Sequence, residues 1–437
     1  MLKWNTIDSH KTYNTERFDL LKLLEGSTRA PYVDSVGDPT IGIGFNLVYN
    51  LEPVLRVIVG KKGWSDALLS RLEAQVDKNY GAGENAKLVA NLNRVMADWH
   101  ANHDADVPST FAFANDHQIA QALDRLAPKY DGYIDKWIAG IPDSDERAAL
   151  FSLAWNAPSL LGPKLKAAIT GGDRAEAWYE IRYNSNGIAL SGIANRRYVE
   201  ADQFNLYDTD GKAGYNEALR AGAMLAAHHQ SVLAYEAKYD PLDAARIKGV
   251  ETIGTIYEEL DPAIATVLRK LGLGANRPID ELLVAGTGLA NVSGDGTSHD
   301  SSKNDDDLIV GSSSANRLSG GGGRDVLAGL GGADTLTGGG ASDLFVFAKA
   351  SDSTVARGDT ITDFAVGIDQ IALRPAAIDF HFLATRNAQF TGDDGDVRWF
   401  WSDGGTIIEV DYDGDKAADL MIELTGKLNL SAGDFLL

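Results

Sequence analysis

Residues 320–346 read GGGGRDVLA GLGGADTLT GGGASDLFV, three nonapeptides in which an aspartate and a large apolar residue recur at fixed positions. The first unit fits the repeat Gly-Gly-x-Gly-x-Asp-x-apolar-x, and the next two fit it with single substitutions. Two degenerate units precede them. The apolar positions, nine residues apart, are Ile309, Leu318, Leu327, Leu336 and Phe345. Because glycines allow tight turns and each apolar side chain points inward, the pattern predicts a parallel β-roll with a core between two sheets.

The polar positions of the same repeat predict calcium binding. Glycine turns expose backbone carbonyls and aspartates add carboxylate oxygens, which together form the all-oxygen environment that Ca²⁺ prefers. The candidate ligands are Asp307, Asn316, Gly320, Gly322, Asp325, Gly329, Gly331, Asp334, Gly338, Gly340 and Asp343. Alternate repeats lie on the same side of a roll, so the predicted pairs are Asp307 with Asp325, Asn316 with Asp334, and Asp325 with Asp343. A flexible glycine-rich linker, the alternative, does not explain the sustained phase of both positions.

Beyond the repeats, the chain resembles the C-terminal region of serralysin-type RTX proteins. The resemblance rests on residues 358–371, on residues 411–420 and on the final residues 433–437, and it covers roughly residue 280 to the end. It implies a secreted protein that carries an uncleaved signal for type I secretion machinery. Asp359, Asp363 and Asp369 are candidates for a further calcium site. Asp411, Asp413 and Asp415 imitate the start of an EF-hand loop but lack the glutamate at its twelfth position, and we interpret them as a turn.

A second informative stretch, residues 25–44, reads EGSTRAPYVDSVGDPTIGIG. The preceding residues have the apolar spacing of a short amphipathic helix, for which Thr15 is the expected N-cap and Gly26 the expected end. A turn signal separates Asp34 from Thr40 and is expected to fold both back towards Glu25. Two carboxylates and a hydroxyl around a helix end and a tight turn are the groups needed to cleave a glycosidic bond with an acid, a base and a positioned water.

This stretch resembles the phage-type lysozymes of glycoside hydrolase family 24, over about residues 12–205. The resemblance implies that Glu25 is the general acid, that Asp34 is the base that orients water, and that Thr40 is a second holder of that water. It also implies substrate contacts at Tyr32, Trp155, Asn156 and Arg196, where Arg196 belongs to a late Asn-Arg element whose arginine pairs with the catalytic glutamate. The sequence departs from several relatives at Phe45-Asn46, where they carry a histidine.

Composition limits the alternatives. The net charge of −22 argues against nucleic acid as a partner, because phosphate binding needs a basic surface. No apolar run reaches the length of a membrane span. The absence of cysteine excludes disulfides and thiolate metal sites. Residues 301–437 hold 22 acids and 10 bases, and such an acidic tail is expected to stay unfolded without calcium and to fold when calcium binds.

These observations predict a multidomain α+β protein with three parts. Residues 1–210 are expected to form a mainly helical lysozyme-like domain with a small β-hairpin lobe, residues 211–282 a helical spacer, and residues 283–437 an all-β parallel β-roll with the secretion signal. The expected activity is that of a secreted muramidase that hydrolyses the β-1,4 bond between N-acetylmuramic acid and N-acetylglucosamine of peptidoglycan, and the pairing of the domains suggests the hypothesis of an antibacterial role. The alternatives are a chitin or chitosan hydrolase and a glycan-binding RTX adhesin with an inactive lysozyme fold.

Overall fold

The computed structural model describes residues 2–186, 191–208, 213–239, 256–272, 299–300, 307–373 and 378–437. Within these ranges, the chain forms two compact units. The first unit contains residues 2–172 and the described part of 180–205, and the second contains 173–179, 206–239 and the described residues from 256 onward. The boundaries expected at 210 and 282 lie outside the described residues, so the three-part division stays a prediction.

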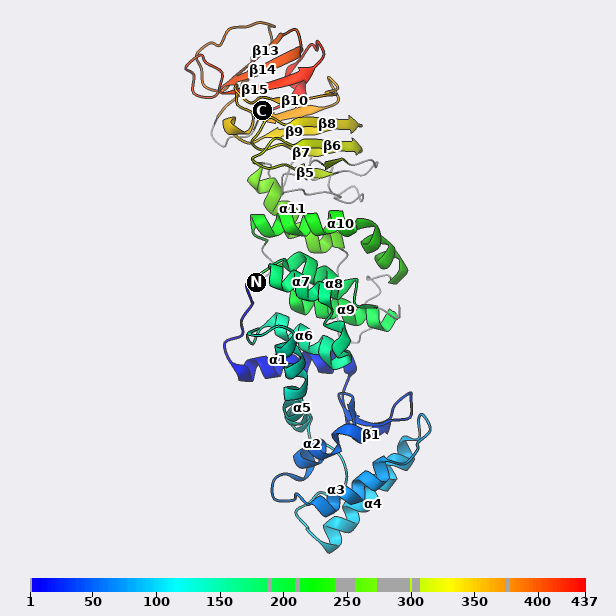
Figure 1. The fold of residues 1–437 in the computed structure, drawn as a ribbon. Coiled ribbons are helices and arrows are strands. Elements are labelled where there is room, and N and C mark those ends of the chain that lie inside the picture. Colours follow the sequence, from blue (N-terminus) through cyan, green and yellow to red (C-terminus); the bar gives the residue numbers. More distant parts are fainter. Residues whose placement is uncertain are drawn as a thin grey trace. The chain divides into compact units, whose positions relative to one another are not determined.

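The first unit is helical with one small sheet (Figure 1). Its helices are α1 (His10–Glu25), α2 (Leu47–Val59), α3 (Asp66–Val76), α4 (Asn85–Asn102), α5 (Asp116–Trp137), α6 (Asp145–Asn156), α7 (Pro163–Gly171) and α9 (Ser191–Phe204). The antiparallel sheet consists of β1 (Thr28–Val33), β2 (Pro39–Gly42) and β3 (Phe45–Asn46). Helix α8 (Arg174–Arg182) is divided between the two units.

Helix α6 forms the centre of the first unit. Ser144 caps it by accepting the backbone N–H of Arg147, and its residues from Glu146 to Ala154 are all buried. It packs against α1, α5 and α9. The helices that carry Glu25 and Arg196 therefore contact the same buried helix.

The expected N-cap of the first helix is wrong. Helix α1 begins at His10, and its cap is Ser9, whose hydroxyl accepts the backbone N–H of Thr12. Thr15 lies inside the helix, where its hydroxyl donates to the carbonyl of Lys11. The expected end is correct, since Gly26 follows the helix at φ +70°, a conformation that favours glycine.

The second unit combines helices with two sheets. Its helices are α10 (Tyr215–Tyr239) and α11 (Ile256–Lys270). One sheet has the order β16-β11-β9-β7-β5, and its neighbouring strands are parallel throughout; the other has the order β12-β13-β14-β15-β10-β8-β6-β4 and is parallel from β4 to β15. The strands are β4 (His299–Asp300), β5 (Leu308–Val310), β6 (Arg317–Gly322), β7 (Val326–Ala328), β8 (Thr335–Gly340), β9 (Leu344–Phe347), β10 (Asp359–Ile361), β11 (Gln370–Leu373), β12 (His381–Phe382), β13 (Asp396–Trp401), β14 (Gly405–Asp411), β15 (Leu420–Thr425) and β16 (Phe435–Leu436).

The repeat residues form the predicted roll. Successive repeats alternate between the two sheets, so each strand pairs with the strand two repeats away; for example, Leu318 is in register with Leu336 and Leu327 with Phe345. All five apolar positions of the repeats are fully buried in one core. The helical N-terminal region and the C-terminal region rich in parallel strands are thus confirmed as the two main parts of the fold.

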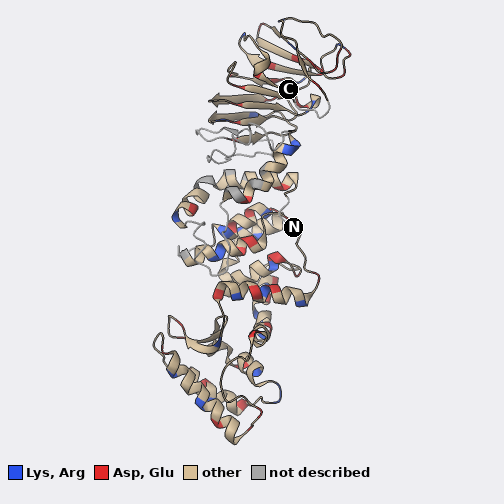
Figure 2. Ribbon diagram, turned by 180° about the vertical axis from the view of Figure 1, so that it is seen from behind, with Lys and Arg blue, Asp and Glu red and all other residues tan. Residues whose placement is uncertain are grey.

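Charge differs between these parts. Figure 2 shows both signs of charge along the helices of the first unit. In residues 301–437, by contrast, the acids outnumber the bases by 22 to 10, and 20 of the 22 are aspartate. None of the helices in the described ranges is long and apolar enough to cross a membrane.

Candidate functional site

Glu25 forms an ion pair with an arginine 171 residues away in the chain. It lies in the last turn of α1 with 27 % of its side chain exposed, and its Oε1 accepts a hydrogen bond from Arg196 Nη1 at 2.5 Å. Arg196 lies on α9 and is 8 % exposed. The structure therefore brings together the two residues of the expected acid–arginine pair in a partly open position.

Asp34 and Thr40 lie at the turn between β1 and β2. Asp34 Oδ1 accepts the backbone N–H groups of Val36 and Asp38 at 2.9 and 2.8 Å, which fixes the turn and leaves Oδ2 without a hydrogen bond from the described residues. Thr40 is 4 % exposed, and its hydroxyl donates to the carbonyl of Asp38 at 3.1 Å. Its lone pairs remain able to accept a hydrogen bond from a water molecule.

Tyr32 lies on β1, in the electric field of both candidate carboxylates. It pairs with Thr40 across the β1–β2 ladder. Burial raises the pKa of its phenol, and the negative charges of Glu25 and then Asp34 raise it further. Since both charges act on one ring, the phenol lies within electrostatic range of the two groups that would carry out acid and base catalysis.

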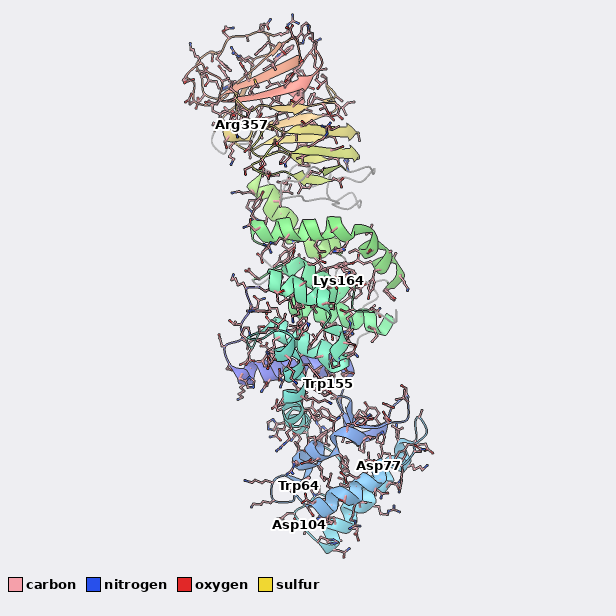
Figure 3. The ribbon with its side chains drawn as sticks, viewed as in Figure 1. Trp64, Asp77, Asp104, Trp155, Lys164 and Arg357 are labelled. Atoms are coloured by element: carbon pink, nitrogen blue, oxygen red, sulfur yellow. The ribbon has the colours of Figure 1, made fainter. Side chains whose placement is uncertain are left out.

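Trp155 and Asn156 are the last two residues of α6, and their side chains contact residues other than Glu25. Trp155, labelled in Figure 3, packs against Tyr130 with ring centroids 4.7 Å apart and meets Phe45 edge-on at 5.9 Å. Phe45 is fully buried, so an aromatic contact occupies the position where the resemblance to phage-type lysozymes led us to expect a histidine. The side-chain oxygen of Asn156 accepts from Arg197 Nη2 at 2.6 Å.

Sequence analysis missed one residue that contacts this network. Glu200 on α9 is fully buried, and its carboxylate accepts hydrogen bonds from Ser152, Arg196 and Arg197. Its spacing of four and three residues from the two arginines is a signal for ion pairs on one helix face. The contact with Ser152 spans 48 residues and was not predictable from that spacing.

The candidate calcium ligands of the roll form a hydrogen-bonded ladder. In three successive repeats, the aspartate Oδ1 accepts the backbone N–H of the residue 18 positions, or two repeats, earlier. The bonds run from Asp307 to Asp325 at 2.7 Å, from Asn316 to Asp334 at 2.7 Å and from Asp325 to Asp343 at 2.9 Å. These are the three pairs expected from the sequence.

The second oxygen of each of these aspartates faces a glycine turn. A Cβ added to Gly320, Gly329 or Gly338 would lie 2.1, 2.2 or 2.2 Å from the Oδ2 of the aspartate five residues later. Only glycine fits at such a distance. Gly322 and Gly340 face each other in register between β6 and β8, and Gly331 donates its N–H to the carbonyl of Ser312 at 3.0 Å.

Asp359 continues the ladder beyond the nonapeptides. Its Oδ1 accepts the backbone N–H of Asp334 at 2.8 Å, and Asp369 does the same for Asp343 at 3.0 Å. Asp369 Oδ2 also accepts the N–H of Ala365, and the carboxylate of Asp363 accepts N–H groups from Gly338 and Gly339. Of these three later candidates, Asp359 alone retains an Oδ2 that is buried and accepts no hydrogen bond within the described residues.

These residues fit a bound cation. Asp334 Oδ2 and Asp359 Oδ2 are both buried without a hydrogen-bond donor from the described residues. Burial raises the pKa of Asp334 to about 6, and burial together with the charges of Asp334 and Asp352 raises the pKa of Asp359 to about 8. Buried carboxylates that face glycine turns offer oxygen ligands to a divalent cation, which would neutralise their charge.

A separate acidic group lies at the turn after β14. Asp411, Asp413 and Asp419 each place one oxygen within 4.8 Å of the others. Both oxygens of Asp411 accept backbone N–H groups, from Gly414 and Lys416 at 2.8 Å each. These bonds account for the buried carboxylate as part of a turn, as expected from the sequence.

Comparison with known proteins supports the assignment of the tail. Residues 303–437 match the family model described as peptidase M10 serralysin C terminal, so the chain has a serralysin-like C-terminal region. None of the curated proteins compared with the chain matches it.

Two solved structures show weaker similarity. They are solution structures of the AlgE6R3 and AlgE6R2 subunits of the mannuronan C5-epimerase of Azotobacter vinelandii. The first is 24 % identical, covers 35 % of this chain and 81 % of its own, and has a TM-score of 0.25. The second is 27 % identical, covers 33 % of this chain and 91 % of its own, and has a TM-score of 0.26. TM-scores this low support no conclusion about activity.

Proposed function

We propose that the protein is a secreted peptidoglycan hydrolase of the muramidase type whose C-terminal region folds on binding calcium. The observation that carries this proposal is the ion pair between Glu25 and Arg196. Glu25 ends a helix, and the hairpin that directly follows it in the chain presents a carboxylate and a hydroxyl. A glycosidase needs this set: an acid for the leaving oxygen and a base for water.

In the proposed reaction, Glu25 protonates the oxygen that leaves. Asp34 Oδ2, the oxygen that the turn does not use, takes a proton from the attacking water, and Thr40 accepts another hydrogen bond from the same water. Arg196 stabilises the negative charge that Glu25 acquires when it gives up its proton. A base that activates water on the opposite face of the sugar leads to inversion at the anomeric carbon. In such enzymes the two carboxyl groups are separated by roughly 6.5–9.5 Å, which leaves room for the water.

In the tail, the candidate ligands of the repeats, with Asp359, would hold Ca²⁺. The bound ion would neutralise the buried carboxylates, and the energy of binding would contribute to folding. The serralysin-like region favours secretion through type I machinery, followed by folding where calcium is plentiful. Export beyond the cell, combined with a peptidoglycan substrate, favours an antibacterial role.

The experiment that tests this function is a sugar-release assay of the intact protein in millimolar calcium, on purified peptidoglycan and on chitin oligomers. Release of muropeptides with inverted anomeric configuration, followed by proton NMR, is the expected result. Release from chitin oligomers alone would favour the chitinase alternative. Tight binding to peptidoglycan without any release would favour the glycan-binding adhesin.

A further inference from the structure

Glu200 is a fully buried carboxylate in the helix that carries Arg196. Its Oε1 accepts a hydrogen bond from the Ser152 hydroxyl at 2.5 Å and from Arg196 Nε at 2.9 Å, and its Oε2 accepts from Arg197 Nη1. A buried charge lowers stability unless partners compensate it, and replacing such a network with apolar side chains is often neutral or stabilising. Stability alone is therefore a weak reason for a carboxylate at this position.

The contacts of Arg196 show what Glu200 does. Arg196 Nε donates to Glu200, Nη2 donates to the carbonyl and hydroxyl of Ser152 at 3.2 and 3.1 Å, and Nη1 donates to Glu25. The guanidinium is planar and rigid, so fixing Nε and Nη2 also fixes the direction of Nη1. Glu200 and Ser152 together aim that nitrogen at Glu25.

Charge adds to this geometric effect. Burial by itself lowers the pKa of the Arg196 guanidinium, but the charges of Glu200 and then Glu25 outweigh burial and raise it. The negative charges of Glu25 and Glu200 equal in number the positive charges of Arg196 and Arg197. Arg196 therefore interacts with two carboxylates, Glu25 and the buried Glu200. The interaction with Glu200 limits how strongly Arg196 binds Glu25.

Glu200 reaches a second candidate residue through Arg197. Arg197 donates Nε to the carbonyl of Ser185 at 2.9 Å and Nη2 to the side-chain oxygen of Asn156 at 2.6 Å, while Nη1 pairs with Glu200. Asn156 is an expected substrate contact. One carboxylate thus anchors both arginines, one directed at the proposed acid and the other at an expected sugar contact.

We propose that Glu200 is a positioning residue that orients Arg196 towards Glu25 and Arg197 towards Asn156, an inference that rests on the proposed function. In the proposed reaction, Glu200 contacts neither the substrate nor the attacking water. It acts through the two arginines, and its loss is expected to change the turnover number more than the Michaelis constant.

The test compares Glu200→Gln with a matched control, Glu146→Gln, in the intact protein. Glu146 is also fully buried, lies on α6 and accepts the backbone N–H of Asn5, which is not one of the residues bonded to Glu200. Glu200→Gln keeps the size of the side chain and removes its charge. We expect kcat on peptidoglycan to fall about 10- to 100-fold, as for a misplaced catalytic group, with KM changed by less than about twofold. Glu146→Gln is expected to alter thermal stability and leave kcat within about twofold.

A second measurement does not depend on activity. With ¹⁵N-labelled arginine, the Arg196 Nε–H signal is expected to exchange slowly with water in the unaltered protein and at least about tenfold faster in Glu200→Gln, because its buried acceptor loses charge. If Glu200→Gln does not fold, Ser152→Ala removes one contact from Glu200 and one from Arg196, and a smaller fall in kcat is expected.

Equal kcat in the two glutamine variants, or unchanged exchange at Arg196, would overturn the positioning role. A protein that hydrolyses no glycan would instead overturn the proposed function. The exchange measurement would then still decide whether Glu200 holds Arg196, so the two failures are distinguishable.

Discussion

The sharpest structural prediction concerns two glycines in one turn of the roll. A Cβ on Gly338 would lie 2.2 Å from Asp343 Oδ2 and 2.8 Å from its carboxyl carbon, whereas a Cβ on Gly340 would meet nothing closer than 3.9 Å. Both residues belong to β8, and both are candidate calcium ligands through their carbonyls, which alanine retains. Gly338→Ala should therefore displace the carboxylate, and Gly340→Ala should not.

The magnitude follows from the contacts that must change. Overpacking at a site that cannot give way costs about 1–3 kcal/mol. If Asp343 moves, the buried N–H of Asp325 loses the acceptor that it now reaches at 2.9 Å, which costs about 1–3 kcal/mol more. We expect Gly338→Ala to lower the free energy of unfolding of the roll by about 2–4 kcal/mol and Gly340→Ala by less than about 1 kcal/mol.

The assay is urea unfolding of the intact protein in saturating calcium, followed by hydrogen exchange of peptides from residues 326–347, with calcium affinity measured by titration calorimetry. Gly338→Ala is expected to weaken calcium binding and to expose these peptides at lower urea. Equal unfolding free energies and calcium affinities of the two variants would refute the reasoning, because only the Cβ added at position 338 would collide with Asp343.

Two further predictions concern the same roll. The pKa values of about 6 for Asp334 and about 8 for Asp359 lie above the ordinary value near 4, so these two groups bind protons more strongly in the folded state without calcium than in the unfolded chain. The stabilisation that they contribute is complete below about pH 4 and is lost as the pH rises towards 8. In chelator, the β-sheet signal of the tail measured by circular dichroism should be larger near pH 5 than near pH 9, because protonation of these carboxylates favours the folded roll, and a flat profile would contradict their burial. Leu327→Ala should lower the free energy of unfolding by about 2–5 kcal/mol because Leu327 is fully buried between the sheets. A change below about 1 kcal/mol in urea unfolding would show that this position is not in the core.

The roll was predictable because the nine-residue repeat determines both where the strands lie and which side chains point into the core. Aspartate and apolar residues stay in phase from Asp307 to Phe345, and the ladder of bonds between residues 18 apart follows directly from that phase. The spacing then changes: Asp359 meets Asp334 across 25 residues, and Asp369 meets Asp343 across 26. The nine-residue period does not predict the positions of Asp359 and Asp369, because the chain first makes a loop that includes the short 3₁₀ helix Ala350–Asp352.

The candidate active site was predictable only in part. The motif from Glu25 to Gly44 and the late arginine identify residues, and the fold brings Glu25 to Arg196 across 171 positions. What supports that arginine depends on tertiary packing. Ser152 is one of many buried residues of α6, and nothing in its local sequence distinguishes the hydroxyl that bonds Glu200. The start of α1 was mistaken for a simpler reason, because Ser9 and Thr15 are both acceptable caps by residue type.

The most direct test of the proposed function is the loss of turbidity of purified peptidoglycan in millimolar calcium, comparing the intact protein with Glu25→Gln and with Glu52→Gln. Glu52 pairs with Arg56 on the exposed side of α2 and serves as the control. We expect lysis by the intact protein and by Glu52→Gln, and a loss of at least about a hundredfold in Glu25→Gln, because general acid catalysis contributes at least that much. Undiminished lysis by Glu25→Gln would contradict the role of Glu25, and absence of lysis in all three proteins would contradict the muramidase itself.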